Sequence, residues 1–149
     1  MARNEYDHMI NKYRHRFLDE GFKDLEISRA EAPYLLKIYK EGKMKMNSLI
    51  SELPFHKSHT TRAINQLEAD GLIIKETNPE DKRAYLLSIT AKGIDTGKKV
   101  EKVFSSWESM VDTVITDEER TVLKNLTKKI YHLFREYYGE EDTINETDV

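Results

Sequence analysis

The sequence of 149 residues contains no cysteine, and this absence excludes several classes of protein. Without thiols there is no disulfide framework, no thiolate zinc site, no cysteine nucleophile and no thiol-based redox switch. No run of about 18 apolar residues occurs, so the sequence predicts no helix that crosses a bilayer. The charged N-terminal segment lacks the apolar stretch of a secretory signal, and we therefore expect a cytoplasmic protein without a membrane partner.

The chain also lacks the excess of positive charge that many nucleic-acid-binding domains carry. It has 24 Lys and Arg against 27 Asp and Glu, a net charge of −3, so composition alone does not point to DNA. Residues 139–149 contain no Lys or Arg, and residues 1–138 hold 24 basic against 22 acidic side chains. We predict that residues 139–149 form a disordered acidic tail and that local charge decides what the rest of the chain binds.

Hydrophobic residues make up 38% of the chain and follow helical spacing along most of it. The pattern predicts a mainly α-helical fold with a small β-hairpin, an α+β class. Gly21 is expected to end the first helix, and Pro33 to delay or kink the second. Ser28 and Thr116 each begin a capping-box pattern. The expected helices cover about 4–20, 28–41, 46–53, 56–70, 90–114 and 116–138, and the expected strands cover 72–77 and 84–89.

Two short helices, a tight turn between them and a following hairpin are typical of a winged helix-turn-helix, whose second helix enters the DNA major groove. In the 56–70 helix, polar side chains lie opposite the apolar face of Ala63, Ile64 and Leu67. Arg62 is expected to pair with guanine and Asn65 with adenine. A solvated helix face has the same composition, so this helix alone leaves both interpretations open. The predicted DNA contacts are Lys57, Ser58, His59, Thr61, Arg62 and Asn65.

The tip of the expected hairpin carries two adjacent cations, Lys82 and Arg83. An arginine at such a tip can enter the narrow, electronegative minor groove beside the major groove that the helix reads. Asp81 lies two residues before Arg83 and is expected to accept a hydrogen bond from its guanidinium, which would orient the side chain. A charged tip that only keeps a hairpin soluble is the alternative.

The stretch from Ser48 to Gly93 closely resembles the recognition helix and wing of the MarR family of regulators. The resemblance implies a homodimer on a pseudo-palindromic operator, usually repressing nearby genes until a small molecule releases it. Three departures are Thr60, in place of a small aliphatic residue, the unusual His59, and Pro33. The shared motifs are Leu53-Pro54-Phe55, Ser58 with Thr61-Arg62, Leu67-Glu68, Asp70-Gly71-Leu72, the wing Pro79 to Arg83, the strand Leu86 to Thr90, and Ala91-Lys92-Gly93.

The terminal helices carry apolar stripes wider than a small winged domain can cover, including Phe17, Trp107 and Phe134. Pairing these stripes across a two-fold axis would set two recognition helices roughly 34–36 Å apart. A monomeric helical core is the alternative. We predict one domain over 4–138, with a DNA-binding core at about 28–93 and dimerisation helices at about 4–20 and 91–138. The family resemblance would place an effector cleft near Tyr13, Tyr34 or Trp107.

We expect no enzyme, and the sequence gives no catalytic residue, cofactor or metal site. Ser58 and His59 are neighbours on a helix and do not face each other. His56 and His59 lack a third ligand at a clear spacing, and no glycine-rich phosphate loop occurs. Two alternatives remain, a metal-responsive regulator and a winged helix that binds only proteins. In the latter, Lys57, Arg62 and Arg83 would be replaceable.

Overall fold

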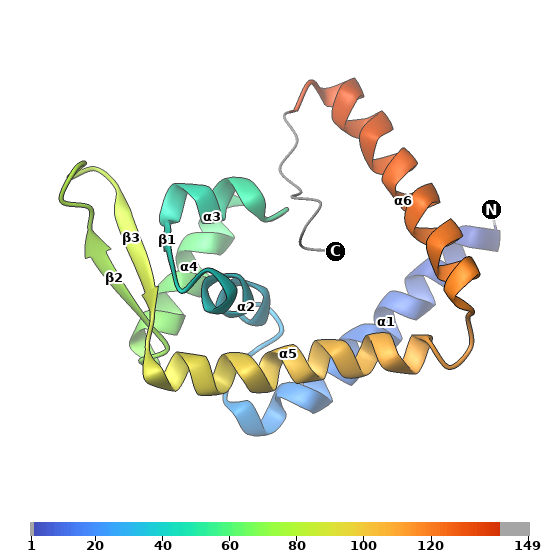
Figure 1. The fold of residues 1–149 in the computed structure, drawn as a ribbon, viewed down its shortest axis with the longest axis horizontal. Coiled ribbons are helices and arrows are strands. Elements are labelled where there is room, and N and C mark those ends of the chain that lie inside the picture. The colour runs from blue at the N-terminus through green and yellow to red at the C-terminus, as the bar shows by residue number, and fades with distance from the viewer. Residues whose placement is uncertain (1, 141–149) are drawn as a thin grey trace. The chain divides into compact units, whose positions relative to one another are not determined.

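The computed structural model describes residues 2–140, and their side chains from Glu5 onward. Two compact units divide the chain, residues 1–107 and 108–149, and their boundary lies within α5. The elements, shown in Figure 1, are α1 (Ala2–Phe22), the 3₁₀ helix η1 (Lys23–Leu25), α2 (Ala32–Glu41), β1 (Lys43–Lys45), α3 (Met46–Glu52), α4 (Lys57–Ala69), β2 (Ile73–Thr77), β3 (Tyr85–Ile89), α5 (Ala91–Val111) and α6 (Asp117–Tyr138).

The expected fold, mainly helical with a small antiparallel sheet, is confirmed. The expected hairpin of β2 and β3 is present, and a strand that the sequence did not predict, β1, pairs with the other side of β3. Met44 is the buried residue of β1 and pairs with Leu87. The β2–β3 hairpin projects from the first unit and forms the wing (Figure 1).

One apolar core holds the first unit together, because α2, α3 and α4 turn their hydrophobic stripes toward the sheet and α1 packs on α5. The largest fully buried side chains come from α1, α2, α3, α4, the sheet and α5: Leu18, Phe22, Tyr34, Leu35, Ile38, Leu49, Thr60, Ile64, Leu67, Ile73, Leu87 and Val100.

Gly21 does not end α1, and that expectation was wrong. The helix continues to Phe22, and Gly21 instead lets the Val103 side chain of α5 approach closely. A Cβ added to Gly21 would lie 2.5 Å from Cγ1 of Val103. The glycine therefore serves helix packing, and the left-handed residue of this region is Glu26, with φ of 53°.

Pro33 lies in the first turn of α2, where its missing N–H has no helical partner to lose. The prediction of a late start is thus confirmed. The expected capping box forms only in part, since the Ser28 N–H donates to the Glu31 carboxylate at 3.1 Å. The Glu31 N–H donates to the Ser28 backbone carbonyl and not to the hydroxyl.

In the second unit, the predicted capping box begins α6. Thr116 Oγ1 accepts from the Glu119 N–H at 3.2 Å, and the Glu119 carboxylate accepts from the Thr116 N–H at 2.9 Å. Arg120 contacts Asp112 and lies 3.7 Å from Glu108, so it ties the start of α6 to the segment before it. The preceding helix ends at Val111 rather than near Val114.

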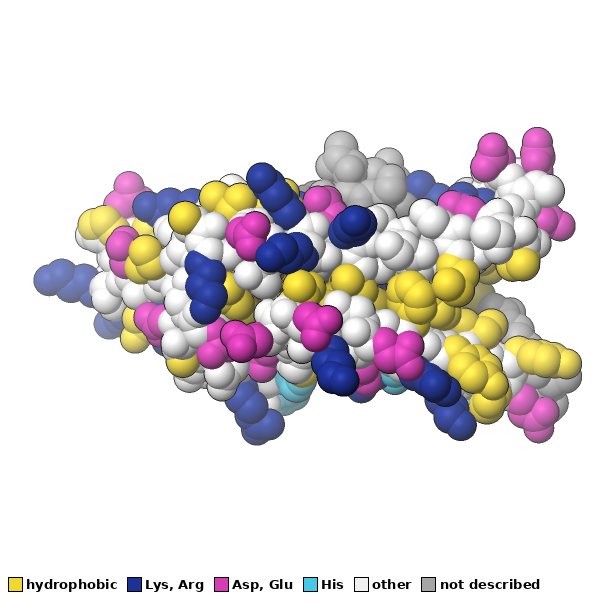
Figure 2. All heavy atoms as spheres, turned by 90° about the horizontal axis from the view of Figure 1, so that it is seen from below, with side chains coloured by type: hydrophobic (Ala, Val, Ile, Leu, Met, Phe, Trp, Pro, Cys, Tyr) yellow, Lys and Arg dark blue, Asp and Glu magenta, His cyan; other side chains and the backbone are white. Residues whose placement is uncertain are grey.

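No residue of α6 is buried within the chain, although the helix has a strong apolar stripe. Helix α1 shows a similar row of exposed apolar side chains, among them Tyr6, Ile10 and Tyr13. Figure 2 shows hydrophobic side chains open on the surface among charged ones. The exposed stripe of α6 consists of Val122, Leu123, Leu126, Ile130, Leu133, Phe134, Tyr137 and Tyr138.

None of the helices within residues 2–140 is long and apolar enough to span a bilayer. The division into a DNA-binding core and dimerisation helices stays a prediction, and residues 141–149 of the expected acidic tail lie outside the described residues.

Candidate nucleic-acid interface

Helix α4 begins at a histidine cap. The Nδ1 atom of His56 accepts from the Ser58 N–H at 3.3 Å and lies 2.7 Å from Ser58 Oγ. Because Nδ1 acts as acceptor, the proton of the neutral ring lies on Nε2, on an exposed side chain. The cap satisfies one of the unpaired N–H groups at the start of the helix and so fixes where α4 begins.

The inner face of α4 is apolar except for Thr60, which is fully buried. The Thr60 hydroxyl lies 3.2 Å from the Tyr34 hydroxyl and 3.5 Å from the His56 carbonyl. A threonine therefore replaces the expected aliphatic residue without leaving an unsatisfied polar group. Tyr34 in turn is fully buried in α2 and connects that helix to α4.

His59 differs from the other predicted contact residues of α4 in its surroundings. Its Nδ1 lies 3.1 Å from the Tyr34 hydroxyl, and its ring stacks on Phe55 with centroids 5.8 Å apart and 28° between the planes. The side chain is half-buried. His59 thus packs on the flank of the helix, and only its outer edge is open to a ligand.

Lys57 and Arg62 are exposed, and neither side chain makes a hydrogen bond or ion pair with a described residue. The Thr61 hydroxyl donates to the Lys57 carbonyl at 3.1 Å, so the threonine retains only acceptor capacity. The structure places Lys57, Ser58, Arg62 and Asn65 on the exposed surface of α4, as the helical spacing predicts.

The wing tip is a turn closed by hydrogen bonds of Asn78. The Asn78 N–H donates to the Ala84 carbonyl at 2.9 Å, and its Oδ1 accepts from the Glu80 N–H at 3.0 Å. Asn78 is only 6% exposed, a burial that no sequence pattern at this polar turn predicts. This asparagine closes the hairpin and sets the direction in which the tip projects.

Asp81 holds Arg83 through the backbone. Its Oδ1 accepts from the Arg83 N–H at 3.0 Å, whereas the expected bond to the guanidinium is not seen among the described residues. A backbone N–H two residues on lies within easier reach of a short carboxylate, as in an Asx turn. The side chains of Lys82 and Arg83 remain exposed, with no partner in residues 5–140.

Helix α4 and the wing are fastened together at the start of α5. The Thr90 hydroxyl lies 2.7 Å from the Gly71 carbonyl and accepts from the Gly93 N–H at 2.9 Å. Lys92 donates to the Asp70 carbonyl at 2.8 Å. A Cβ on Gly93 would lie 2.0 Å from the Leu72 carbonyl oxygen, so only glycine permits this approach. The helix and the wing therefore form one anchored unit.

A contact that the sequence analysis missed joins α4 to the wing. Lys75 Nζ on β2 lies 3.3 Å from Asn65 Oδ1 on α4 and 4.5 Å from the centroid of the Tyr85 ring on β3. Asn65, Lys75 and Tyr85 lie on three different elements. They meet because β2 pairs with β3 and the hairpin folds beside α4.

Nothing in this region resembles a catalytic or metal site. Ser58 Oγ contacts His56 Nδ1, but both side chains are exposed at a helix end, and no carboxylate is seen to orient the ring. His56 and His59 have different partners. Within the described part of the chain, no three His, Asp or Glu side chains gather as a metal site would require.

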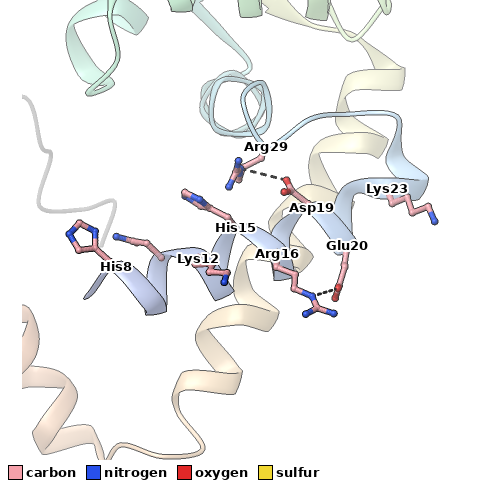
Figure 3. Close-up of a pocket in the computed structure, with 9 residues that line it drawn as sticks. His8, Lys12, His15, Arg16, Asp19, Glu20, Lys23 and Arg29 are labelled. Carbon is pink, nitrogen blue, oxygen red and sulfur yellow. Dashed lines mark hydrogen bonds and ion pairs between the residues drawn. The ribbon is translucent and has the colours of Figure 1, made fainter. Parts of the chain in front are cut away.

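A separate open hollow of about 830 Å³ lies along α1 (Figure 3). Arg16 bonds Glu20 at 2.9 Å, and Arg29 lies 3.5 Å from Asp19. Lys12 and Lys23 also line the hollow, so its lining holds more cations than carboxylates. The bond to Glu20 raises the pKa of the Arg16 guanidinium. The expected cleft residues Tyr13, Tyr34 and Trp107 do not line this hollow. Its lining consists of His8, Asn11, Lys12, His15, Arg16, Asp19, Glu20, Lys23 and Arg29.

Comparison with known proteins gives consistent matches. The model of the MarR family matches residues 27–85. The transcriptional regulator BilQ of Clostridioides difficile (strain CD3) is 37% identical over 94 residues, which span 62% of this chain and 64% of BilQ. A crystal structure of a MarR-like transcription regulator from Bacillus cereus is 28% identical, with a TM-score of 0.71 over 88% of this chain and 96% of that one. A MarR variant from E. coli complexed with operator DNA is 24% identical, with a TM-score of 0.77 over 87% of this chain and 94% of that one.

Proposed function

The chain belongs to the MarR family of winged-helix proteins, and from this premise we propose that it is a sequence-specific, DNA-binding transcription regulator. The observation that supports this function best is the arrangement of free cations. Arg62 projects from α4, and Lys82 and Arg83 project from the wing, on elements fastened to each other through Thr90 and Gly93. Charged donors held on rigid elements can meet DNA without ordering a loop first.

We propose distinct roles for these side chains. Arg62 enters the major groove and pairs with guanine, while Lys57 donates to a backbone phosphate. The Ser58 hydroxyl faces His56 Nδ1 and donates to a phosphate only once it turns away from that ring. Arg83 enters the minor groove, with Lys82 beside it on a phosphate and Asp81 fixing the turn behind both. Thr61 and His59 contribute from the flank, since each has one polar atom already engaged inside the chain.

A homodimer follows from the exposed apolar side chains of α1 and α6. A single chain leaves Leu126, Ile130 and Phe134 about half exposed, a state that soluble monomers avoid for a whole helix face. A second copy is the occupant that fits, because pairing equivalent faces presents two copies of α4 to one duplex. Such a dimer would recognise a pseudo-palindromic operator and repress the genes beside it.

We propose that a small anionic molecule releases the DNA by binding the hollow on α1. The hollow carries more cations than carboxylates, and both carboxylates already have partners. A screen of small carboxylates for displacement of a bound duplex tests this role. Lys12→Glu should weaken the response, whereas Lys98→Glu on α5 should leave it unchanged. A response equal in both variants would exclude the hollow.

A transcription regulator works where the chromosome lies, so we propose that this protein is cytoplasmic. We also propose that it has no catalytic activity.

A gel-shift titration tests the DNA-binding function, on duplexes that the wild-type protein selects from a random pool. Arg62→Ala and Arg83→Ala should each weaken binding while leaving the circular dichroism spectrum unchanged. If Lys57, Arg62 and Arg83 can all be replaced without loss of affinity, the winged helix serves protein contacts instead.

A further inference from the structure

Lys75 occupies an inward-facing position of the wing. It pairs with the buried Leu87, so its side chain starts on the same face of the sheet as Ile73 and Ile89, the face that packs on α4. A leucine would satisfy that position as well as a lysine does. Lys75 is only partly buried, and its ammonium group makes an exposed contact beside α4, so we look for a role beyond filling space.

The ammonium has two partners. The face of the Tyr85 ring lies 4.5 Å from Nζ, and Asn65 Oδ1 lies 3.3 Å from it. Tyr85 lies diagonally across the hairpin from Lys75 and contributes the π electrons that attract a cation. The lysine is thereby held between the wing and the recognition helix.

This contact fixes which way the Asn65 amide points. An ammonium group only donates hydrogen bonds, so the amide atom that faces it must be the oxygen. The NH₂ group of Asn65 is therefore turned away from Lys75, on the exposed side of α4. Asn65 follows Arg62 by three residues and shares its exposed surface.

An asparagine reads adenine by donating to N7 and accepting from the N6 amino group at the same time. With Lys75 on Oδ1, an approaching adenine amino group would meet a second donor that carries a full positive charge. Guanine presents two acceptors, O6 and N7, to the NH₂ group. Building on the DNA-binding function proposed above, we infer that Lys75 is a positioning residue for Asn65. It occupies one of the two lone pairs of Asn65 Oδ1, places a positive charge beside the other, and so shifts the preference of Asn65 from adenine to guanine.

Selection of duplexes from a random-sequence pool tests this inference. Wild-type protein should enrich guanine at the base pair next to the one that Arg62 reads. Lys75→Met removes the ammonium and keeps an unbranched apolar stem, so adenine should become preferred at that base pair by roughly five- to tenfold, as one bidentate contact can discriminate. Lys98→Met removes the same charge from α5 and should leave the selected motif unchanged.

The double variant separates positioning from a simple phosphate contact. In an Asn65→Ala background, Lys75→Met should change nothing at this base pair, because no amide remains to be oriented. If Lys75 only contacts a phosphate, Lys75→Met will lower affinity for every sequence and reduce the salt dependence, with the motif intact. That result overturns the inference and leaves the regulator function standing. Failure of the wild-type protein to enrich any motif overturns both.

Discussion

The hydroxyl of Tyr34 on α2 lies 3.1 Å from Nδ1 of His59 on α4. The same hydroxyl lies 3.2 Å from the buried Thr60 hydroxyl, so one tyrosine connects the supporting helix to two successive residues of the recognition helix. Phe55 covers the outer side of the His59 ring. The angle at which α4 meets DNA thus depends on a polar contact inside the motif as well as on apolar packing.

Tyr34→Phe should keep the fold but lower the free energy of unfolding by about 1–2 kcal/mol, because a buried hydrogen-bond partner of Thr60 is lost. Urea denaturation monitored by circular dichroism measures the change. Tyr39→Phe makes the same chemical change on α2, at a hydroxyl that shows no hydrogen bond in residues 5–140, and should cost much less. Equal effects of the two substitutions would argue against the network.

Asn78→Ala should loosen the wing tip without changing its charge. The substitution removes the acceptor of the Glu80 N–H, a bond whose loss costs about 1 kcal/mol, so operator affinity should fall about fivefold. Fluorescence anisotropy on a selected duplex gives the affinity. The exposed neighbour Thr77 provides a control, since Thr77→Ala should bind as wild type does. An unchanged affinity for Asn78→Ala would mean that the turn does not direct Arg83.

Lys57→Ala and Lys82→Ala should weaken binding to all sequences alike, since phosphate contacts carry no base information. Because the dimer carries two copies of each lysine, each substitution should also reduce the slope of log K against log salt by about 1.8, at about 0.9 for each lost phosphate contact. Titrations at several salt concentrations measure this slope, with Lys98→Ala as the control of equal charge. Slopes that match wild type in both variants would remove these lysines from the interface.

Leu126→Glu should convert the dimer to a monomer. Leu126 is 51% exposed within one chain, so the substitution does not disturb a buried site unless a second copy covers it. Asn125→Glu adds the same charge to the polar side of α6 and should leave the dimer intact. Sedimentation equilibrium distinguishes the two states. A wild-type protein that sediments as a monomer would contradict the proposed assembly.

The sequence predicted those features that are encoded locally. The limits of α4, expected at 56–70 and observed at Lys57–Ala69 with caps at His56 and Asp70, follow from helical spacing and from end signals. The capping box at Thr116 and the paired strands of the wing are likewise short-range patterns. These features can be predicted from sequence because the interactions that form them join residues only a few positions apart.

The features that sequence reasoning missed depend on contacts between distant segments. Strand β1 has three residues and one buried side chain, too few to show alternation. Gly21 carries the signature of a helix end, but packing against Val103 decides its role. The contact of Lys75 with Asn65 exists only because the hairpin folds back beside α4. None of these has a local signature that periodicity can detect.

Hydroxyl-radical footprinting of a selected duplex shows whether two chains bind DNA together, because it maps where each half of the protein touches DNA. A symmetric pair of chains that each present α4 and the wing predicts two equivalent protected half-sites, with centres about 10–10.5 base pairs apart. Protection flanking each half-site in the minor groove should disappear in Arg83→Ala. A single protected segment, or uniform cleavage at low salt, would contradict binding by a symmetric pair of winged helices.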